Sequence, residues 1–453
     1  MSGKAAAAAP LHPMRADLVR LVRLAAPVVA ARVGVMTMGL TDTIVVGRLS
    51  ATQLGFMALA WAAAAVVLNS SMGLLSGVQV MTSRALGAGD RPAAGAALRR
   101  GLVYGLWVGV LAAGALILGM PPILDALRLQ GGLAEGARAP LLMLAVSMPS
   151  FAISSAAASW LEGLGRMTPP LVMMWMANVL NLGLDLVLVP GGFGIPTMGA
   201  AGATAATLIG RTVLALASLA YIALMPDARA LGVFRKPLPS RADEIDQRRV
   251  GYGAAASGFF EVTAFSAMSV IAGWISATTV AAWAVSLNVL ALVFMVPLGI
   301  STATAVMVAQ AYGAQDRAAL HRAAVLGFGV TAVVGVVFGV LIAPTAGLIA
   351  PLYTTDRATI VMAAGALLLT CVFFLPDGLQ VVVAQSLRAR GDVAVPTLTH
   401  LMSYAVVMVP LAYALAIPLH GGMTGMVWAT IIAAYVSAGL LLGRYWMLAR
   451  REA

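Results

Sequence analysis

Long apolar stretches alternate with short polar segments along the whole chain. Each apolar stretch holds about 20 residues or more, which is the length that an α-helix needs to cross the hydrocarbon core of a bilayer. The pattern predicts twelve spans, at residues 18–47, 52–83, 94–119, 138–161, 168–190, 199–224, 250–275, 279–309, 320–349, 358–386, 394–418 and 422–446. We therefore expect an all-α integral membrane protein with twelve transmembrane helices.

Glycine and polar positions of the first half recur in the second half at one constant offset. GAGDR at 87–91 returns as GAQDR at 313–317, SAT at 50–52 returns as SAT at 276–278, and Gly73 falls on Gly299. Such repeats are a feature of membrane carriers, and an even number of spans per copy gives both copies the same orientation. In each GAxDR segment, Gly suits the end of one helix and Asp suits the cap of the next. The chain is thus predicted to be two six-helix repeats.

A polar segment between the repeats sets the domain boundaries. It is the most charged run in the chain and contains Pro226, Pro237 and Pro239, so it is too polar to enter lipid. The expected organisation is an N-terminal tail at 1–17, a first lobe at 18–225, a linker at 226–249, a second lobe at 250–447 and a C-terminal tail at 448–453. The N-terminal tail lacks the long apolar core of a cleaved signal peptide.

Composition and charge support the membrane assignment. With 61% hydrophobic and 10% charged residues and a mean hydropathy of +0.95, the chain is too apolar for a soluble protein, in which about 25% of residues are charged. The net charge of +11 at first suggests a nucleic-acid surface. Most Lys and Arg residues, however, fall on the linker side of the predicted spans, which is the positive-inside pattern. We expect both termini in the cytoplasm and no nucleic-acid partner.

Catalytic and metal-binding patterns are missing from the sequence. There is one cysteine, Cys371, and the four histidines follow no ligand spacing. The sequence also has no Gly-rich phosphate loop with its Lys and no nucleophile beside a base. We therefore predict a protein that is not an enzyme, that needs no cofactor, and that takes its energy from an ion gradient.

Four acidic residues lie within the predicted spans: Asp42, Asp185, Glu261 and Asp377. Each costs at least about 2.5 kcal/mol to place in a bilayer, so it needs a partner, a cavity or a task. The repeat reproduces none of them, because the position equivalent to Asp42 is Met268. The scaffold is duplicated but its charges are not, which points to function.

The first-lobe acids share one depth. At helical rise, Asp42 and Asp185 each lie about 8 Å from the outer ends of their spans. Asn181 lies one turn deeper than Asp185 on the same helix face, and Asn178 lies a further turn in. These oxygens suit either a small hard cation such as Na+ or one shared proton. A structural hydrogen-bond network between helices is the alternative.

The second-lobe acids also share one depth. Glu261 and Asp377 each lie about 17 Å from the cytoplasmic ends of their spans, near the bilayer middle. Arg32 occupies a position whose repeat equivalent is residue 258, one turn from Glu261, and we expect it to approach that acid. Arg211 also lies within a span, and the sequence predicts no partner for it.

Prolines within three spans predict bends. Pro27, Pro297 and Pro376 each remove a backbone donor inside a predicted transmembrane helix. Each is either a fixed kink or a hinge, and we take Pro27 as the hinge candidate.

Several segments resemble the multidrug and toxic compound extrusion (MATE) family over nearly the whole chain. They are LAAPVV with Pro27, GLTDTIVVGRLSATQLG around Asp42, NVLNLGLDLVLVPGGFGIPTMGAAGATAAT, GFFE at 258–261 and LPDGLQ at 375–380. The resemblance implies a MATE/MOP-type fold, with two six-helix lobes around a central cavity. It also implies a bacterial inner-membrane antiporter, monomeric and surrounded by lipid, that exports cationic and amphipathic drugs by alternating access in exchange for H+ or Na+.

The same resemblance assigns site residues. The family's first-lobe cation or proton site falls on Asp42, Asn181 and Asp185, and the acids of its Na+-linked branch fall on Glu261 and Asp377. One turn before Asp377, where that branch often has an aromatic hydroxyl, this chain has Phe373, which removes one oxygen ligand.

Two other functions are weighed against drug efflux. A flippase for lipid-linked oligosaccharide, built on a related fold, would have more cationic residues in its cavity, whereas here acids outnumber Arg32. A membrane enzyme would need a nucleophile or a metal cluster at the interface, which the sequence does not offer.

Overall fold

The computed structural model describes residues 13–126, 132–192, 194, 196–235 and 240–452, and every element in these residues is a helix. Residues 1–12 of the tail predicted at 1–17, and the linker residues Pro237 and Pro239, lie outside the described residues. The first lobe contains α1 (Pro13–Leu49), α2 (Ala51–Gly87), α3 (Arg91–Gly114), the π-helix η1 (Ala115–Gly119), α4 (Met120–Ala126), α5 (Leu133–Val146), α6 (Met148–Gly163), α7 (Thr168–Leu188) and α8 (Ala200–Leu224). The second lobe contains α9 (Arg241–Ile275), α10 (Ala277–Gly313), α11 (Arg317–Ile349), the 3₁₀-helix η2 (Ala350–Leu352), α12 (Arg357–Thr370), α13 (Phe374–Ala389), α14 (Ala394–His400), the π-helix η3 (Leu401–Met408), α15 (Val409–Ala416) and α16 (Gly422–Glu452).

These helices confirm the twelve predicted spans. Within the described residues, nine helical stretches are long and apolar enough to cross a membrane, and two bent pairs raise that number to eleven. The pairs are α5 with α6, bent by 40°, and α12 with α13, bent by 53°. The remaining span is α1, which has 37 residues and carries Arg32 and Asp42 in its interior. The bend before α13 lies three residues ahead of Pro376, where the sequence predicts one, whereas the bend before α6 was not predicted.

Some helices extend beyond the predicted spans. The helix of the seventh span begins at Arg241, inside the segment predicted as linker, because Ser240 accepts a hydrogen bond from the Asp243 backbone and caps it. Likewise, α1 begins at Pro13 rather than at residue 18. Hydropathy marks where a helix leaves lipid, whereas capping marks where the helix ends.

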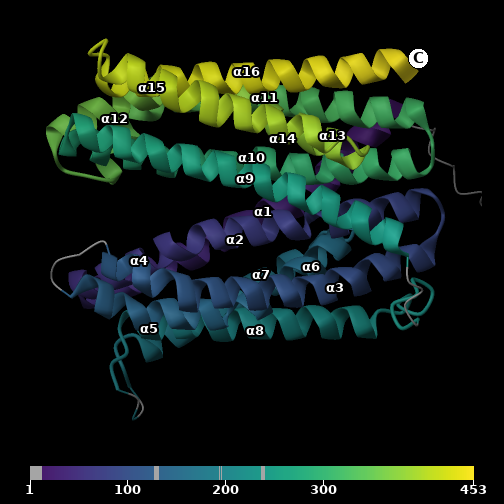
Figure 1. Ribbon diagram of the computed structural model, residues 1–453, viewed down its shortest axis with the longest axis horizontal. Helices are drawn as coiled ribbons and strands as arrows, with labels where there is room; N and C mark the ends of the chain where they lie inside the picture. The colour runs from purple at the N-terminus through teal and green to yellow at the C-terminus, as the bar shows by residue number, and fades with distance from the viewer. Residues whose placement is uncertain (1–12, 127–131, 193, 195, 236–239, 453) are drawn as a thin grey trace, which may run out of the picture.

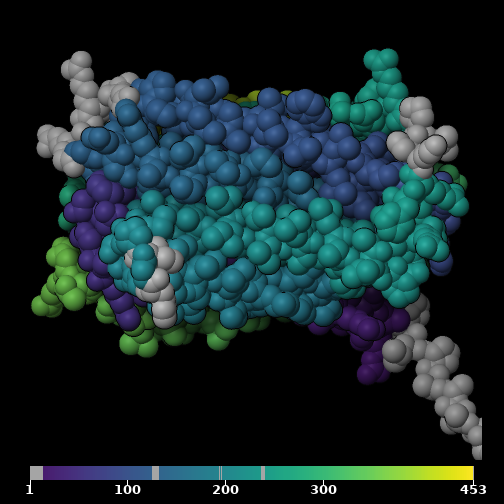
Figure 2. Space-filling view, turned by 90° about the horizontal axis from the view of Figure 1, so that it is seen from below, coloured from purple at the N-terminus to yellow at the C-terminus, as the bar shows by residue number. Residues whose placement is uncertain are grey.

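The two lobes lie one above the other in Figure 1, with α1 and α2 of the first lobe beside α9 and α10 of the second. Across this interface α1 packs on α10, and α2 packs on both α9 and α10. Figure 2 looks onto the first lobe, where α8 runs across the middle of the face. Leu216 and Leu224 of α8 are 62% and 82% exposed, as expected for side chains that face lipid.

Close contacts across the interface are reciprocal. A Cβ atom on Gly87 would overlap the carbonyl oxygen of Gln310, and one on Gly313 would overlap that of Arg84. Gly313 is the repeat equivalent of Gly87, and Gln310 is that of Arg84. A contact that appears twice with its partners exchanged requires a pseudo-two-fold axis between the lobes.

The turns of the two repeats also match. Asp90 accepts a hydrogen bond from the Ala93 backbone at 3.0 Å, and Asp316 accepts one from the Ala319 backbone at 2.8 Å. The predicted Asp caps are therefore confirmed in both copies. We call the end of the molecule that holds these turns and residues 226–249 the linker end, and the opposite end the far end.

Candidate functional site

The first-lobe site joins three helices around Asp42 of α1. Thr207 of α8 donates a hydrogen bond to Oδ2 of Asp42 at 3.0 Å, and Asn181 and Asp185 of α7 adjoin the same carboxyl group. All four side chains are fully buried. The sequence predicted Asp42 and Asp185 at one depth, with Asn181 one helical turn from Asp185 on the same face, and the structure brings the three together.

Most polar atoms of this cluster lack a hydrogen-bond partner among the described residues. These atoms are Oδ1 of Asp42, both carboxyl oxygens of Asp185 and both amide atoms of Asn181. A buried carboxyl group without partners is costly in an apolar surrounding. The arrangement is therefore suited to take up a proton or a small cation.

Asn178 has a different position from the other three predicted residues. Its Nδ2 donates to the backbone carbonyl of Gly34 in α1 at 2.9 Å, which ties α7 to α1 one turn from Asn181. The Asn178 Oδ1 is buried without a partner in the described part of the chain. Asn178 thus links α7 to α1 through its amide nitrogen.

Pro27 lies in the half of α1 that packs against the second lobe. Leu21, Leu24 and Val28 share a core with Val306 of α10. Further along the helix, Asp42 contacts α8 of the first lobe. A helix whose two halves belong to different lobes needs a bend or hinge between them, and Pro27 has no backbone N–H to resist one.

Asp377 of α13 is the centre of a second polar cluster. Gln380, one turn along, donates to Oδ1 of Asp377 at 2.9 Å and to the hydroxyl of Tyr404 at 2.5 Å. Tyr404 lies in the π-helix η3, and Glu261 of α9 adjoins its hydroxyl. Glu261 and Asp377 therefore meet through Gln380 and Tyr404, as their equal depth predicted.

Phe373 lies at the break between α12 and α13, with 3% of its surface exposed. The family resemblance implied that Phe373 removes a hydroxyl group from the second-lobe site. Tyr404, on another helix, places a hydroxyl group there instead. The sequence analysis did not identify Tyr404.

Arg388 is the basic residue of this second cluster. It is buried, it donates from Nη2 to the hydroxyl of Ser257 at 2.6 Å, and its charge acts on Glu261. Arg388 follows the predicted span at 358–386 by two residues, so the hydropathy pattern counts it among the bases on the linker side of the spans. Its burial shows that this arginine belongs to the interior of the lobe.

Arg32 does not pair with Glu261, contrary to the sequence-based expectation. Its Nη2 lies 3.8 Å from Oε1 of Glu162 in α6. The expectation assumed that the first and seventh spans face each other, whereas α1 packs on α10 and α2 packs on α9. Glu162 itself was missed because it follows the predicted span at 138–161 by one residue.

Arg211 has the partners that the sequence could not name. Its Nη1 donates to the Ser147 hydroxyl at 2.8 Å, and its guanidinium lies over the rings of Phe151 and Trp61, at 4.9 and 5.5 Å. Ser147 stands at the bend between α5 and α6. Thr207 and Arg211 are separated by one turn of α8 and so lie on the same face of that helix. Asking which side chains share this face is the only sequence argument that would have placed both near Asp42.

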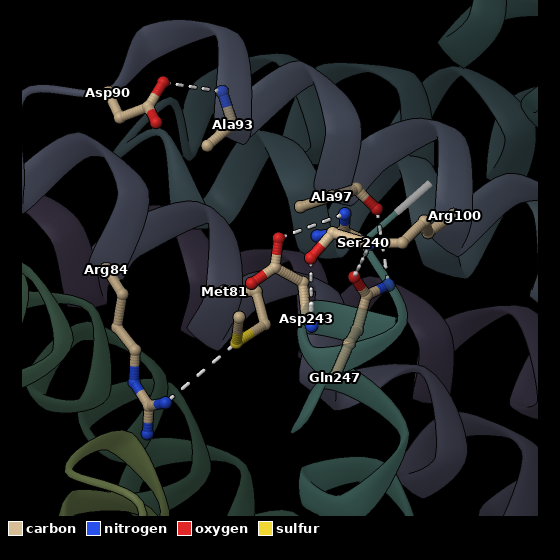
Figure 3. A network of polar contacts seen from close by, with 9 residues as sticks. All are labelled: Met81, Arg84, Asp90, Ala93, Ala97, Arg100, Ser240, Asp243 and Gln247. Atoms are coloured by element: carbon tan, nitrogen blue, oxygen red, sulfur yellow. Dashed lines mark hydrogen bonds and ion pairs between the residues drawn. The ribbon is translucent and has the colours of Figure 1, made fainter. Parts of the chain in front are cut away.

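The linker end closes the interface between the lobes. Figure 3 shows Gln247 of α9 donating to the Ala97 carbonyl of α3 at 3.3 Å, while Arg100 donates to Gln247 at 3.3 Å. Arg100 also lies 3.6 Å from Asp243. Further along, Gln79 of α2 donates to the Thr302 carbonyl of α10. In the described part of the chain, these hydrogen bonds and the ion pair hold the two lobes together at the linker end.

Comparisons with known proteins give relatives of this chain in sequence and in fold. The model of the MatE family matches residues 27–187 and 254–414, one match in each lobe. A Caulobacter vibrioides chain named as a probable multidrug resistance protein NorM is 54% identical over 443 residues, which cover 98% of this chain and 94% of that one. The multidrug resistance protein NorM of Vibrio cholerae is 28% identical, over 96% and 97% of the two chains. The crystal structure of MATE in complex with MaL6 is similar with a TM-score of 0.86 at 22% identity, over 96% and 98% of the two chains.

Proposed function

The chain belongs to the MatE family of multidrug and toxic compound extrusion transporters, and we propose that it exports cationic and amphipathic organic compounds in exchange for H+ or Na+. The observation that carries this proposal is that each lobe places its own pair of acids beside neutral side chains with oxygen atoms, with Asp42, Asp185 and Asp377 buried and Glu261 half-buried. Buried acids of this kind inside a membrane domain serve ion and substrate pathways. The names of its relatives support multidrug resistance as the process.

The first-lobe cluster is the proposed site of the coupling ion. A proton fits there because two adjoining carboxyl groups favour one shared charge. A Na+ ion fits as well, because Asp42, Asp185, Asn181 and Thr207 present oxygen atoms of the type that hard cations prefer. Binding of either ion removes the cost of the unpartnered oxygens and so stabilises the packing of α1 against α7 and α8.

The second-lobe cluster is the proposed site of competition between ion and substrate. Glu261 and Asp377 give this part of the lobe a negative charge that Arg388 offsets only in part. A lipophilic monovalent cation is attracted to that charge, whereas an anionic amphiphile is repelled. An oligosaccharide flippase would need the opposite polarity for its phosphate groups, so the acids favour drug efflux.

Alternating access follows from the closure of the linker end. We place this end in the cytoplasm of a bacterial inner membrane, because it carries most of the basic residues. The structure then corresponds to a state closed toward the cytoplasm, and the cycle requires the linker-end contacts to open. Bending of α1 at Pro27 would couple ion binding at Asp42 to these contacts. We propose a monomer as the working unit, since each chain has both lobes.

Transport in vesicles tests the proposal. The purified protein is reconstituted, and ethidium movement is followed with a pH gradient alone, with a Na+ gradient alone, and with neither. Acceleration by at least one gradient is expected, and the gradient that works identifies the ion. Failure of both gradients to move ethidium or another lipophilic cation, with protein that is folded and inserted, would overturn the proposed function.

A further inference from the structure

Arg211 is a buried arginine held close to the first-lobe site without touching it. Its side chain is 9% exposed, and Ser147, Phe151 and Trp61 fix the guanidinium as described above. Thr207, which contacts Asp42, lies one turn away on the same face of α8, a rise of about 6 Å. The negative charge of Asp42 acts on Arg211 over this distance.

Only the first lobe has a basic residue at the position of Arg211. In the last span of each repeat the offset is three residues shorter, so Gly202 falls on Gly425 and Thr207 on Thr430. With this alignment the second repeat has Ala434 where the first repeat has Arg211. A charge that the repeat does not reproduce is not required by the scaffold. Ser147 also does not need Arg211 to satisfy its hydroxyl, because that group donates to the Leu144 carbonyl at 2.6 Å.

Charge balance then limits what the site takes up. Asp42, Asp185 and Arg211 together carry one net negative charge when both acids are ionised. Since uncompensated charge inside a bilayer is expensive, the site favours the state in which one further cation makes it neutral. The charge of Arg211 and that of a cation in the first-lobe site, taken as roughly 8 Å apart at an effective dielectric constant of about 20, repel each other. This repulsion changes the affinity of the site for the cation about 30-fold.

We propose that Arg211 is a tethered cation that sets the number of coupling ions in the first lobe at one. This inference rests on the proposed function and adds the ion count to it. Asp42, which accepts a hydrogen bond from Thr207 and faces the charge of Arg211, stays a carboxylate. Asp185, whose two oxygens have no partner among the described residues, receives the proton or shares the Na+ ion.

Proton uptake by the purified protein tests the count. Detergent-solubilised protein in Na+-free buffer is titrated from mildly alkaline to mildly acidic pH, and the protons bound per molecule are compared between variants. Groups elsewhere titrate equally in all of them, so differences report on this site. Arg211→Met should bind one more proton than the wild type, because both acids must then be neutralised. Arg211→Lys, which keeps the charge, should match the wild type.

A second substitution makes the test independent of the stability of the single variant. Asp42→Asn leaves Asp185 balanced by Arg211, so it should bind one proton fewer than the wild type. Adding Arg211→Met to Asp42→Asn removes that balance and should restore the lost proton. A purely structural arginine predicts no such rescue. Arg48→Met removes a charge from an exposed position at the end of α1 and should leave the count unchanged.

The outcomes separate this inference from the proposed function. Equal proton uptake by Asp42→Asn and by the double variant would overturn the role of Arg211, even if the wild type exchanges ethidium for ions. Absence of ion-driven ethidium transport by the wild type would overturn the proposed function, whatever the proton counts are.

Discussion

Arg84 of the first lobe donates from Nε to the backbone carbonyl of Ala389 in the second lobe, at 3.0 Å. A second bond runs from its Nη2 to the Arg388 carbonyl at 3.2 Å, and the guanidinium lies 4.9 Å from the ring centre of Tyr312. Carbonyl groups at the C-terminal end of a helix carry partial negative charge, so a cation is favoured at the end of α13. Arg84 therefore holds the two lobes together at the linker end.

We predict that Arg84→Gln shifts the protein toward states with an open linker end. Charge-assisted hydrogen bonds contribute about 1.5–3 kcal/mol each when buried, and partial exposure lowers this to about 1–2 kcal/mol in total. The population of open states should rise about 5- to 30-fold. The measurement is the labelling rate of a cysteine placed at Thr302 in a Cys371→Ser background, with an impermeant maleimide added from the linker side.

The matched control for that experiment is Arg91→Gln, which removes the same charge from an exposed position at the same end. Its labelling rate should equal that of the parent. If Arg84→Gln also labels at the parental rate, Arg84 does not contribute to closure.

Asp42→Asn is predicted to abolish ion-coupled efflux while the protein remains folded. The amide keeps the shape of the side chain and can still bond Thr207, but it neither binds a proton nor neutralises a cation. Initial rates of ethidium transport in vesicles should fall to the level of protein-free vesicles. Wild-type rates in this variant would exclude Asp42 from coupling.

Asn181→Ala should weaken coupling less than Asp42→Asn. It removes one neutral ligand from a cluster that keeps both acids, and it leaves the Asn178 bond to Gly34 intact. The half-saturating ion concentration should rise, while the maximal rate changes little. A larger loss than that of Asp42→Asn would mean that the amide, and not the acid, is the main ligand.

Depth along a helix could be predicted from the sequence, whereas lateral contacts could not. Counting residues from the span ends placed Asp42 with Asp185 and Glu261 with Asp377, because helical rise is constant. The repeat predicted the Asp90 cap of α3 in the same way. The partner of Arg32 could not be obtained by counting, since it depends on which helices adjoin and how each is rotated about its axis.

The missed residues share this dependence on packing. Tyr404 reaches Gln380 from a π-helix, whose extra residue per turn changes the direction of every later side chain. Arg211 meets Ser147 because the span is bent at that point. Pro149, inside the predicted span at 138–161 and two residues after Ser147, marks this bend in the sequence, but the prediction of bends was limited to Pro27, Pro297 and Pro376. The one sequence signal for the contacts of Arg211 was its charge inside a predicted span, with no partner predicted for it.

Glu261→Gln and Asp377→Asn are predicted to be coupled. Because Gln380 and Tyr404 connect the two acids, neutralising one changes the hydrogen bonding of the other. Each single variant should lose most ion-driven ethidium transport, and the double variant should lose little more. The measurement is a double-mutant cycle on initial rates at equal protein amounts. Additive losses in free energy would show that the acids act independently.

Gly87→Ala and Gly313→Ala are predicted to prevent closure of the linker end without unfolding either lobe. Each new methyl group would overlap a backbone carbonyl of the other lobe, Gln310 in one case and Arg84 in the other, and backbone cannot move aside as a flexible side chain does. Within a helix, alanine itself stabilises by about 0.5–1 kcal/mol relative to glycine. The expected result is therefore a normal or slightly raised melting temperature, faster labelling at Thr302→Cys, and ethidium transport reduced at least about 10-fold.

Gly183→Ala in α7 and Gly329→Ala in α11 are the matched controls, because a Cβ atom at either position meets nothing within 4 Å. Both should transport normally. The two interface glycines are repeat equivalents, so their substitutions should have similar effects on labelling, and the double variant should open the linker end further. Normal transport by Gly87→Ala or by Gly313→Ala would show that the lobes need not approach this closely during the cycle, and the reciprocal contact would then be a feature of one resting state.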